Sequence, residues 1–200
     1  MSSKINTLIG RQAYELCRNR IGEILIEELN NQFNVLGNTY AKANVTVEGN
    51  GIAETSDNSE VIISLADGSF DNEHVGNSRG KYIFNVDVFC RAKSTALLDG
   101  SVNAAYKCQA LIGIIRYILK DPQYRTLGFA PPFISNVTVM GIKIGESNKE
   151  DLNNTVAGRL TLSVTVNETN ALLTASLIAG YQTTITLGTS AQGYMYNPPI

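Results

Sequence analysis

Charge is scarce in this sequence. Only 17% of the 200 residues are charged and the formal net charge is −2, whereas soluble domains typically carry about 25% charged residues. No extended block of Lys and Arg occurs, which argues against sequence-independent binding of a nucleic-acid backbone as the main task. Asn, Thr, Ser and Gly fill the gap. Such a surface is either ordinary and neutral or packed against other subunits, because amides and hydroxyls cost less to bury than ions.

Long apolar runs are also missing. No window of about 20 apolar residues is present, so the sequence predicts no transmembrane helix. The apolar stretch at residues 5–9 is too short and too interrupted for a secretory signal. Hydrophobic residues still make up 44% of the chain, enough for one domain with a sizeable core. We expect a core domain over residues 1–170.

Histidine occurs once, at His74, next to Asp71 and Glu73 in FDNEHVGNSRG. These three candidate ligands lie within four residues and lack a second cluster that would complete a metal site. A Ser–His or Cys–His nucleophile pair would depend on the same loop residue, without a fixed orienting group. A dispersed carboxylate site stays open as an alternative, but we predict no catalytic, metal-binding or cofactor-binding residues, and therefore not an enzyme.

The cysteines are few, odd in number and far apart: Cys17, Cys90 and Cys108. Each falls on or beside an apolar face of a predicted element. We interpret them as buried, reduced thiols that act as small hydrophobic side chains, which fits synthesis in the cytosol.

Two segments show helical periodicity. Residues 7–35 carry an apolar stripe, with Thr7 as a candidate N-cap and Gly37-Asn38 as a candidate C-cap. Residues 99–119 form the second predicted helix, which Asp99 would cap and Asp121-Pro122 would end. The second half of this helix is apolar nearly all round, which indicates burial on more than one side.

Strand-like alternation appears in five short segments. We predict strands at residues 44–48, 61–65, 81–92, 134–145 and 156–168. In 81–92 every second residue from Tyr82 to Cys90 is apolar, which predicts one face in a core. Ile83 and Phe89 interrupt the polar side of this strand, and we expect them to contact a neighbouring chain. The polar stretch DGSFDNEHVGNSRG at 67–80 is interpreted as a long loop, a kind that is often functional or mobile.

The order of elements is helix, three strands, helix, two strands. It predicts an α+β fold: a mostly antiparallel sheet of about five strands with two helices packed on one face. The strand at 156–168 alternates cleanly between apolar and polar residues, so the other face of the sheet meets water or a polar lumen.

The C-terminal segment contains no charged residue from 169 to 200. It is too rich in Thr, Gly and Gln for a membrane helix and too apolar for a solvated tail. Residues 182–187 are a candidate strand. We interpret 171–200 as an extended arm that packs against its own domain or a neighbouring subunit.

Four segments together resemble a known group of proteins. They are the first helix, IGRQAYELCRNRIGEILIEELNNQF, the strand KYIFNVDVFCRAKS, the second helix, DGSVNAAYKCQALIGIIRYIL, and the strand pair NVTVMGIKIGE and VAGRLTLSVTVNET. Over roughly residues 5–170 this arrangement resembles the tail-terminator and neck (head-to-tail joining) proteins of tailed bacteriophages.

The resemblance implies a phage virion structural protein, assembled in the host cytoplasm. Such proteins form closed homo-oligomeric rings, sixfold or twelvefold, next to tail tube or portal-side neck proteins. Genomic DNA would pass through the lumen without specific binding, and no membrane would be involved. The alternative from another class is a small α+β module that binds a ligand or peptide through loop 67–80.

Overall fold

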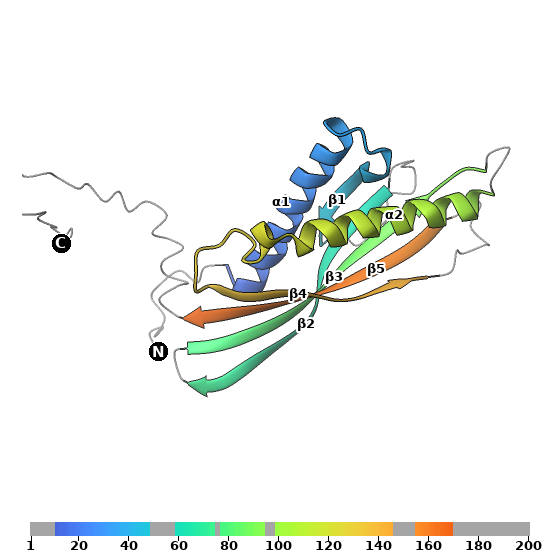
Figure 1. Ribbon diagram of the computed structural model, residues 1–200. Coiled ribbons are helices and arrows are strands. Elements are labelled where there is room, and N and C mark those ends of the chain that lie inside the picture. Colours follow the sequence, from blue (N-terminus) through green and yellow to red (C-terminus); the bar gives the residue numbers. More distant parts are fainter. Residues whose placement is uncertain (1–10, 49–58, 75–76, 95–98, 146–154, 170–200) are drawn as a thin grey trace, which may run out of the picture.

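The computed structural model describes residues 11–48, 59–74, 77–94, 99–145 and 155–169. It shows a five-stranded sheet with two long helices on one face (Figure 1). The predicted α+β class is therefore confirmed. The predicted arm, residues 171–200, lies outside the described residues.

The elements follow the predicted order along the chain. They are α1 (Ala13–Asn34), β1 (Ala43–Val47), β2 (Ser59–His74), β3 (Asn77–Arg91), α2 (Gly100–Lys120), β4 (Ile134–Ile144) and β5 (Thr155–Thr169). Short 3₁₀ turns occur at Thr39–Ala41 and Pro122–Tyr124. Across the sheet the strand order is β1-β2-β3-β5-β4. Only β1 and β2 pair in parallel, and the other neighbours are antiparallel.

The helix ends partly match the predicted ones. Gln12 is extended and caps α1, and its backbone N–H donates to Glu15 Oε2 at 2.8 Å. The prediction of a helix at residues 11 and 12 is therefore wrong, because α1 begins at Ala13. The candidate cap Thr7 lies outside the described residues. At the other end α1 stops at Asn34, and Gly37 takes the left-handed conformation (φ 71°) that glycine favours. The second helix ends at Lys120, and the predicted stop at Asp121-Pro122 is confirmed, because Asp121 is its extended C-cap.

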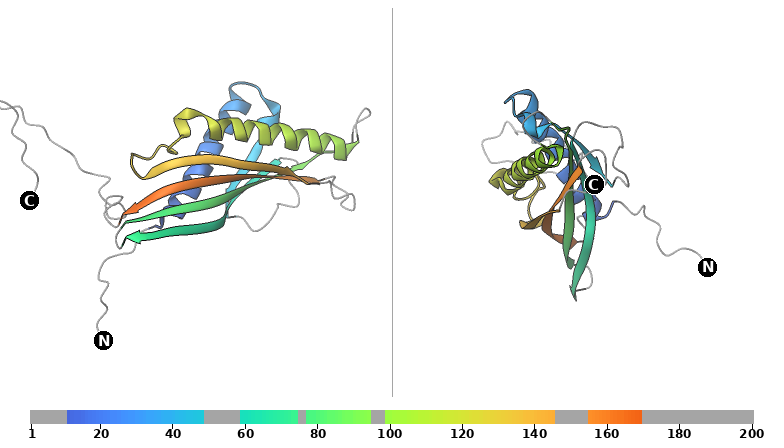
Figure 2. Two further views of the ribbon diagram at one scale, coloured as in Figure 1. Left: turned by 60° about the horizontal axis from the view of Figure 1, so that its bottom comes forward. Right: turned by 90° about the vertical axis from the view of Figure 1, so that its right-hand side faces the viewer.

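The core lies between the helices and one face of the sheet. The alternating residues of β3 that were predicted to face inward are all buried: Tyr82, Phe84, Val86, Val88 and Cys90. They meet buried side chains from both helices: Cys17, Ile21, Ile24 and Leu25 of α1, and Cys108, Leu111, Ile112 and Ile115 of α2. Both helices therefore pack on the same face of the sheet, as Figure 2 also shows.

Residues 67–74 and 77–80 of the polar stretch lie in strands and not in the predicted loop. β2 continues to His74, β3 begins at Asn77, and the two strands pair along this length. A register irregularity between Leu65 and Asp67 changes which residues face the helices. Beyond it the strand residues 66–71 are exposed, so the apolar alternation that reveals a half-buried strand is missing. Opposite charges face each other here, because Asp71 pairs with Arg79.

Candidate functional site

The face of the sheet without helices carries polar side chains together with charged side chains of both signs, among them Asp71, Arg79 and Lys81. Its side chains include Asn85 of β3 and a row on β5 that consists of Thr161, Ser163 and Thr165. In the left view of Figure 2 both helices lie above or behind the sheet, on the side opposite to this face. The predicted polar second face of 156–168 is thus present in the structure.

A depression of about 740 Å³ lies on this helix-free face. Four strands contribute to its lining, including Ser69 of β2, Arg79 and Lys81 of β3, Asn136 of β4 and Thr165 of β5. Hydroxyl and amide groups line it together with the charged side chains of Asp71, Arg79 and Lys81. It can therefore offer hydrogen bonds and charges of both signs to a passing or bound polar partner.

One ion pair neutralises charge on the same face. Arg159 of β5 donates from Nε and Nη2 to the carboxylate of Asp87 on β3, with an Nη2–Oδ2 distance of 2.9 Å. The hydrogen bond to Asp87 raises the pKa of the Arg159 guanidinium above its ordinary value. This two-point contact holds both charges close together, so neither projects a strong field outward.

Ile83 and Phe89 lie on the helix-free face, as the alternation predicts. Both are half-buried rather than exposed. Ile83 pairs with Asp67 and Ser163, and Phe89 pairs with Glu60 and Ala157. Neighbouring strands of the same chain cover part of each side chain. The contact of the remaining exposed part with a neighbouring chain stays a prediction.

The outer strand β4 carries a more exposed apolar group, which we call the β4 edge: Met140, Ile142 and Ile144. Their exposed fractions are 58%, 40% and 42%. Ile142 pairs with Leu160 and Ile144 with Gly158, so both side chains lie on the helix side, beyond the cover that α2 provides. An outer strand with exposed apolar side chains and unpaired backbone groups is prone to pair with another chain.

Alternation in the sequence predicts the wrong face of the sheet for Ile142. Simple alternation puts Met140 and Ile142 on one face and Val139 on the other. The structure has a bulge between Val139 and Gly141, which moves Ile142 to the same face as Val139. The GIKIG stretch was the available signal, but the bulge position cannot be read from a period of two.

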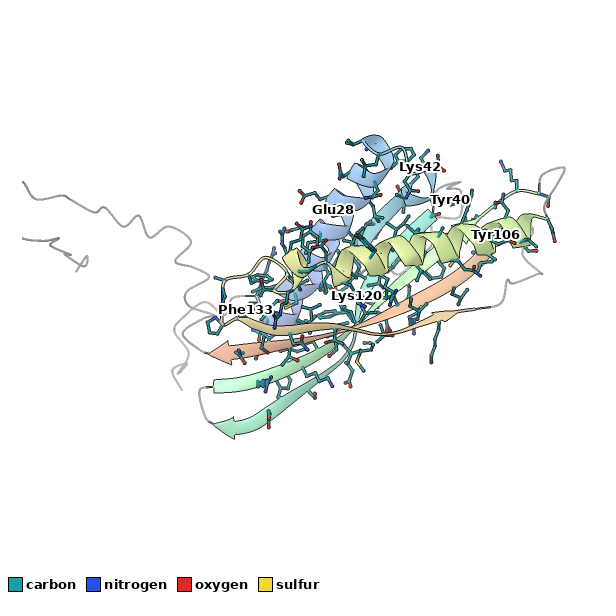
Figure 3. The ribbon with its side chains drawn as sticks, in the orientation of Figure 1. Glu28, Tyr40, Lys42, Tyr106, Lys120 and Phe133 are labelled. Carbon is teal, nitrogen blue, oxygen red and sulfur yellow. The ribbon has the colours of Figure 1, made fainter. Side chains whose placement is uncertain are left out.

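Apolar side chains are also exposed at the opposite side of the sheet, where α1 passes β1. Ile26 is 44% exposed, next to a hollow of about 290 Å³ that Ala43, Asn44 and Val45 also line. Val35, Leu36 and Tyr40 after α1 are exposed as well. Tyr40, in the turn after α1, and Tyr106, on α2, both lie on the helix side of the sheet (Figure 3). We call Ile26, Val35, Leu36 and Tyr40 the α1–β1 corner.

The cysteines are buried and free, as predicted. Burial raises the pKa of the Cys17 thiol to about 12, which keeps it protonated and unreactive at neutral pH. Cys90 Sγ lies 3.2 Å from Ser59 Oγ, also in the interior. The thiols therefore act as core side chains.

The candidate metal ligands are not on a loop. Asp71 and His74 both belong to β2, and Glu73 lies between them. In the part of the chain that the structure describes, no three His, Cys, Asp or Glu residues gather to hold a metal ion. Among the same residues no helix is long and apolar enough to cross a membrane.

The comparisons with known proteins assign no family. No protein-family model matches the chain, and no curated protein matches it significantly.

Proposed function

We propose that this chain is a phage virion structural protein that forms a closed ring at the tail end or at the head–tail junction. It would complete tail assembly and leave a channel for DNA. One observation carries the proposal: apolar side chains are exposed at both outer sides of the same sheet, at the β4 edge and at the α1–β1 corner.

These two surfaces differ in sequence and lie on opposite sides of the strand order. A contact between two different surfaces repeats from copy to copy, and it gives a ring when the rotation closes. Burying apolar area contributes about 25 cal/mol for each Å² removed from water. A ring interface would thus remove from water the side chains that a single copy leaves exposed.

The helix-free face supports a lumen for DNA. It carries Ser, Thr and Asn side chains, the Asp87–Arg159 ion pair, and Arg79 and Lys81 close to Asp71. Phosphate binding by proteins depends on Lys and Arg, and carboxylates placed among these basic side chains weaken that attraction, so the polymer can pass. The sixfold or twelvefold symmetry, and the contacts with tail tube or portal-side neck proteins, follow from the resemblance and belong to the same proposal.

Size-exclusion chromatography with light scattering tests the ring directly. The expected mass is a multiple of 21.7 kDa, and negative-stain images should show rings with a central hole. A strictly monomeric particle, at high protein concentration and in a range of salt concentrations, would contradict the proposal.

A second function is favoured by the depression on the helix-free face. Residues Ser69, Asp71 and Arg79, all within the stretch 67–80, line it. A small polar ligand or an extended peptide would bind there across the strands. In that case a peptide library should yield binders to the monomer, and Arg79→Ala with Lys81→Ala should abolish the binding while the ring-forming surfaces stay unchanged.

A further inference from the structure

The outer edge of β2 is paired only over its first residues. β1 pairs with Ser59 through Ile63, and the last backbone contact is the hydrogen bond from Glu48 N to Ile63 O at 3.0 Å. β2 then continues to His74. Among the described residues, no strand pairs with this edge beyond Ile63. β2 is the outermost strand at this side of the sheet in Figure 2, and among the described residues the backbone N–H and C=O groups on the outer side of residues 64–74 face no further strand. We call this edge the open edge of β2.

This open edge has one apolar and one polar side. On the helix side Phe70 is 54% exposed, and its ring meets Tyr82 edge-on with centroids 5.8 Å apart. On the helix-free side Ser69 and Asp71 border the polar depression. A strand that pairs here must therefore alternate in the same way, with apolar residues next to Phe70 and polar residues next to Ser69.

A segment of the same chain has this pattern. Residues 182–187 read QTTITL. One side would carry Thr183, Ile185 and Leu187, and the other Gln182, Thr184 and Thr186. Thr and Ile favour strands because their branched side chains fit a pleated surface. No charge would have to be buried against the ring of Phe70.

The position of Thr169 makes the edge reachable. Thr169 pairs with Asn77, which in turn pairs with His74, so β5 ends at the same end of the sheet as β2. The two strands run in the same direction, and a segment that returns from this end runs antiparallel to β2, the commoner arrangement. Strands lie about 4.8 Å apart, so roughly 14 Å separates β5 from a position outside β2. About a dozen extended residues span roughly 40 Å, more than this gap.

We propose that residues 182–187 add to the open edge of β2 in the same chain, as a sixth strand of the sheet. The covalent tether favours this intramolecular pairing, because it keeps the segment at an effective concentration in the millimolar range. The added strand satisfies the edge backbone groups and covers Phe70. The inference concerns the single chain and does not depend on ring formation.

Disulfide trapping tests the pairing in the full-length protein. Ser69→Cys combined in turn with Thr183→Cys, Thr184→Cys, Ile185→Cys and Thr186→Cys scans the register. We expect an intramolecular disulfide at one or two of these positions, seen as a faster-migrating monomer on a non-reducing gel. Gln109→Cys on exposed α2, combined with Thr184→Cys, is the matched control and should not form it.

A mixture of two single variants shows whether the added strand comes from the same chain or from another copy. When Ser69→Cys chains are mixed with Thr184→Cys chains, an abundant disulfide-linked dimer would show that the segment comes from another copy and would overturn the proposal. Absence of any trapped disulfide in the register scan would overturn it as well.

Hydrogen exchange gives an independent measurement. Ile185→Pro interrupts the added strand, whereas Ala191→Pro, outside the segment, is its control. We expect the amides within residues 64–74 to exchange about tenfold faster in Ile185→Pro, because their hydrogen bonds are lost, and to be unchanged in Ala191→Pro. Equal exchange in both variants and the unsubstituted chain would contradict the pairing.

Discussion

The phenol of Tyr82 on β3 donates a hydrogen bond to the carboxylate of Glu168 on β5. Tyr82 is only 2% exposed, and its ring also contacts Tyr14 of α1 and Phe70 of β2. One side chain thus joins three strands and a helix at the end of the core where the β2–β3 pair extends. A buried phenol requires such a partner, because its hydroxyl gives up water on folding.

Tyr82→Phe tests the value of this bond. It removes the donor and leaves the ring contacts in place. We expect a loss of about 1–3 kcal/mol in the free energy of unfolding, the typical result when a bond to a charged group is broken. Chemical denaturation measures it, with Tyr117→Phe, on a residue 78% exposed, as the control that should stay within about 0.5 kcal/mol.

The thiol of Cys17 makes stability depend on alkaline pH. Its pKa is raised from 9.0 to about 12 by burial, with a smaller contribution from Glu168. In the unfolded chain the thiol ionises near its ordinary pKa, whereas in the folded chain it stays protonated. A raised folded pKa gives a contribution that is complete below the unfolded pKa and is lost as pH rises toward the folded pKa. We expect the unfolding free energy to fall between about pH 9 and pH 12.

The matching variant for this pH effect is Cys17→Ala. It should lower the free energy of unfolding at all pH values, because it removes a buried side chain. Above pH 9 it should make the free energy of unfolding fall less steeply with pH. A thiol reagent at pH 8 should leave the native protein unmodified and modify all three cysteines after denaturation. An identical slope in the variant would contradict the assignment to Cys17.

Two glycines give opposite predictions for the same substitution. A Cβ at Gly158 would overlap Ile112 Cδ1 and lie 2.9 Å from Cys108 Sγ, whereas a Cβ at Gly113 meets nothing within 4 Å. Gly158→Ala forces α2 away from β5, and we expect it to cost about 1–3 kcal/mol. Gly113→Ala, in the interior of α2, should gain roughly 0.5–1 kcal/mol from the helix preference of Ala. Thermal unfolding of both variants measures the difference.

The β4 edge is tested by charge. Ile142→Lys combined with Ile144→Lys should prevent assembly of the proposed ring and leave monomers, because burying two ammonium groups without partners is costly. Thr138→Lys puts the same group on the opposite face of the same strand and should leave the assembly intact. Light scattering gives the masses, and circular dichroism shows that each variant is folded. If the double variant still formed rings, the β4 edge would not be part of the interface between copies.

Phe89 gives a separate test of the helix-free face. Phe89→Asp should leave the fold intact, since the side chain is only half-buried, and should block assembly if a neighbouring copy covers it. The measurement is the mass in solution beside the circular dichroism spectrum. Unchanged assembly would show that this strand does not contact the next copy.

Strong periodicity made much of the fold predictable. The apolar alternation from Tyr82 to Cys90 gave the inward face of β3, and the stripes of both helices gave their buried sides. The stop at Asp121-Pro122 was readable because proline cannot continue the helical hydrogen bonds. The start of α1 was less clear, since Gln12 is an uncommon cap and its partner Glu15 is one of several charged residues nearby.

The candidate surfaces were harder to predict. The β4 edge depends on a bulge at Val139 and Gly141, and the length of β2 on another at Leu65 and Asp67. A bulge adds one residue without a sequence signature, and it exchanges the two faces of everything that follows. The stretch 67–80 therefore looked like a loop, although backbone pairing with β3 holds it in strands.

The sequence by itself determined which side of each regular helix and strand is apolar, since hydrophobic spacing depends only on the period of a helix or strand. It thus determined two helices, five strands and the buried thiols. Only the tertiary structure decided which apolar residues stay uncovered. Ile142, Ile144 and Phe70 are as apolar as the core, but their exposure depends on how far α1 and α2 extend over the sheet and on where each strand slips by one residue.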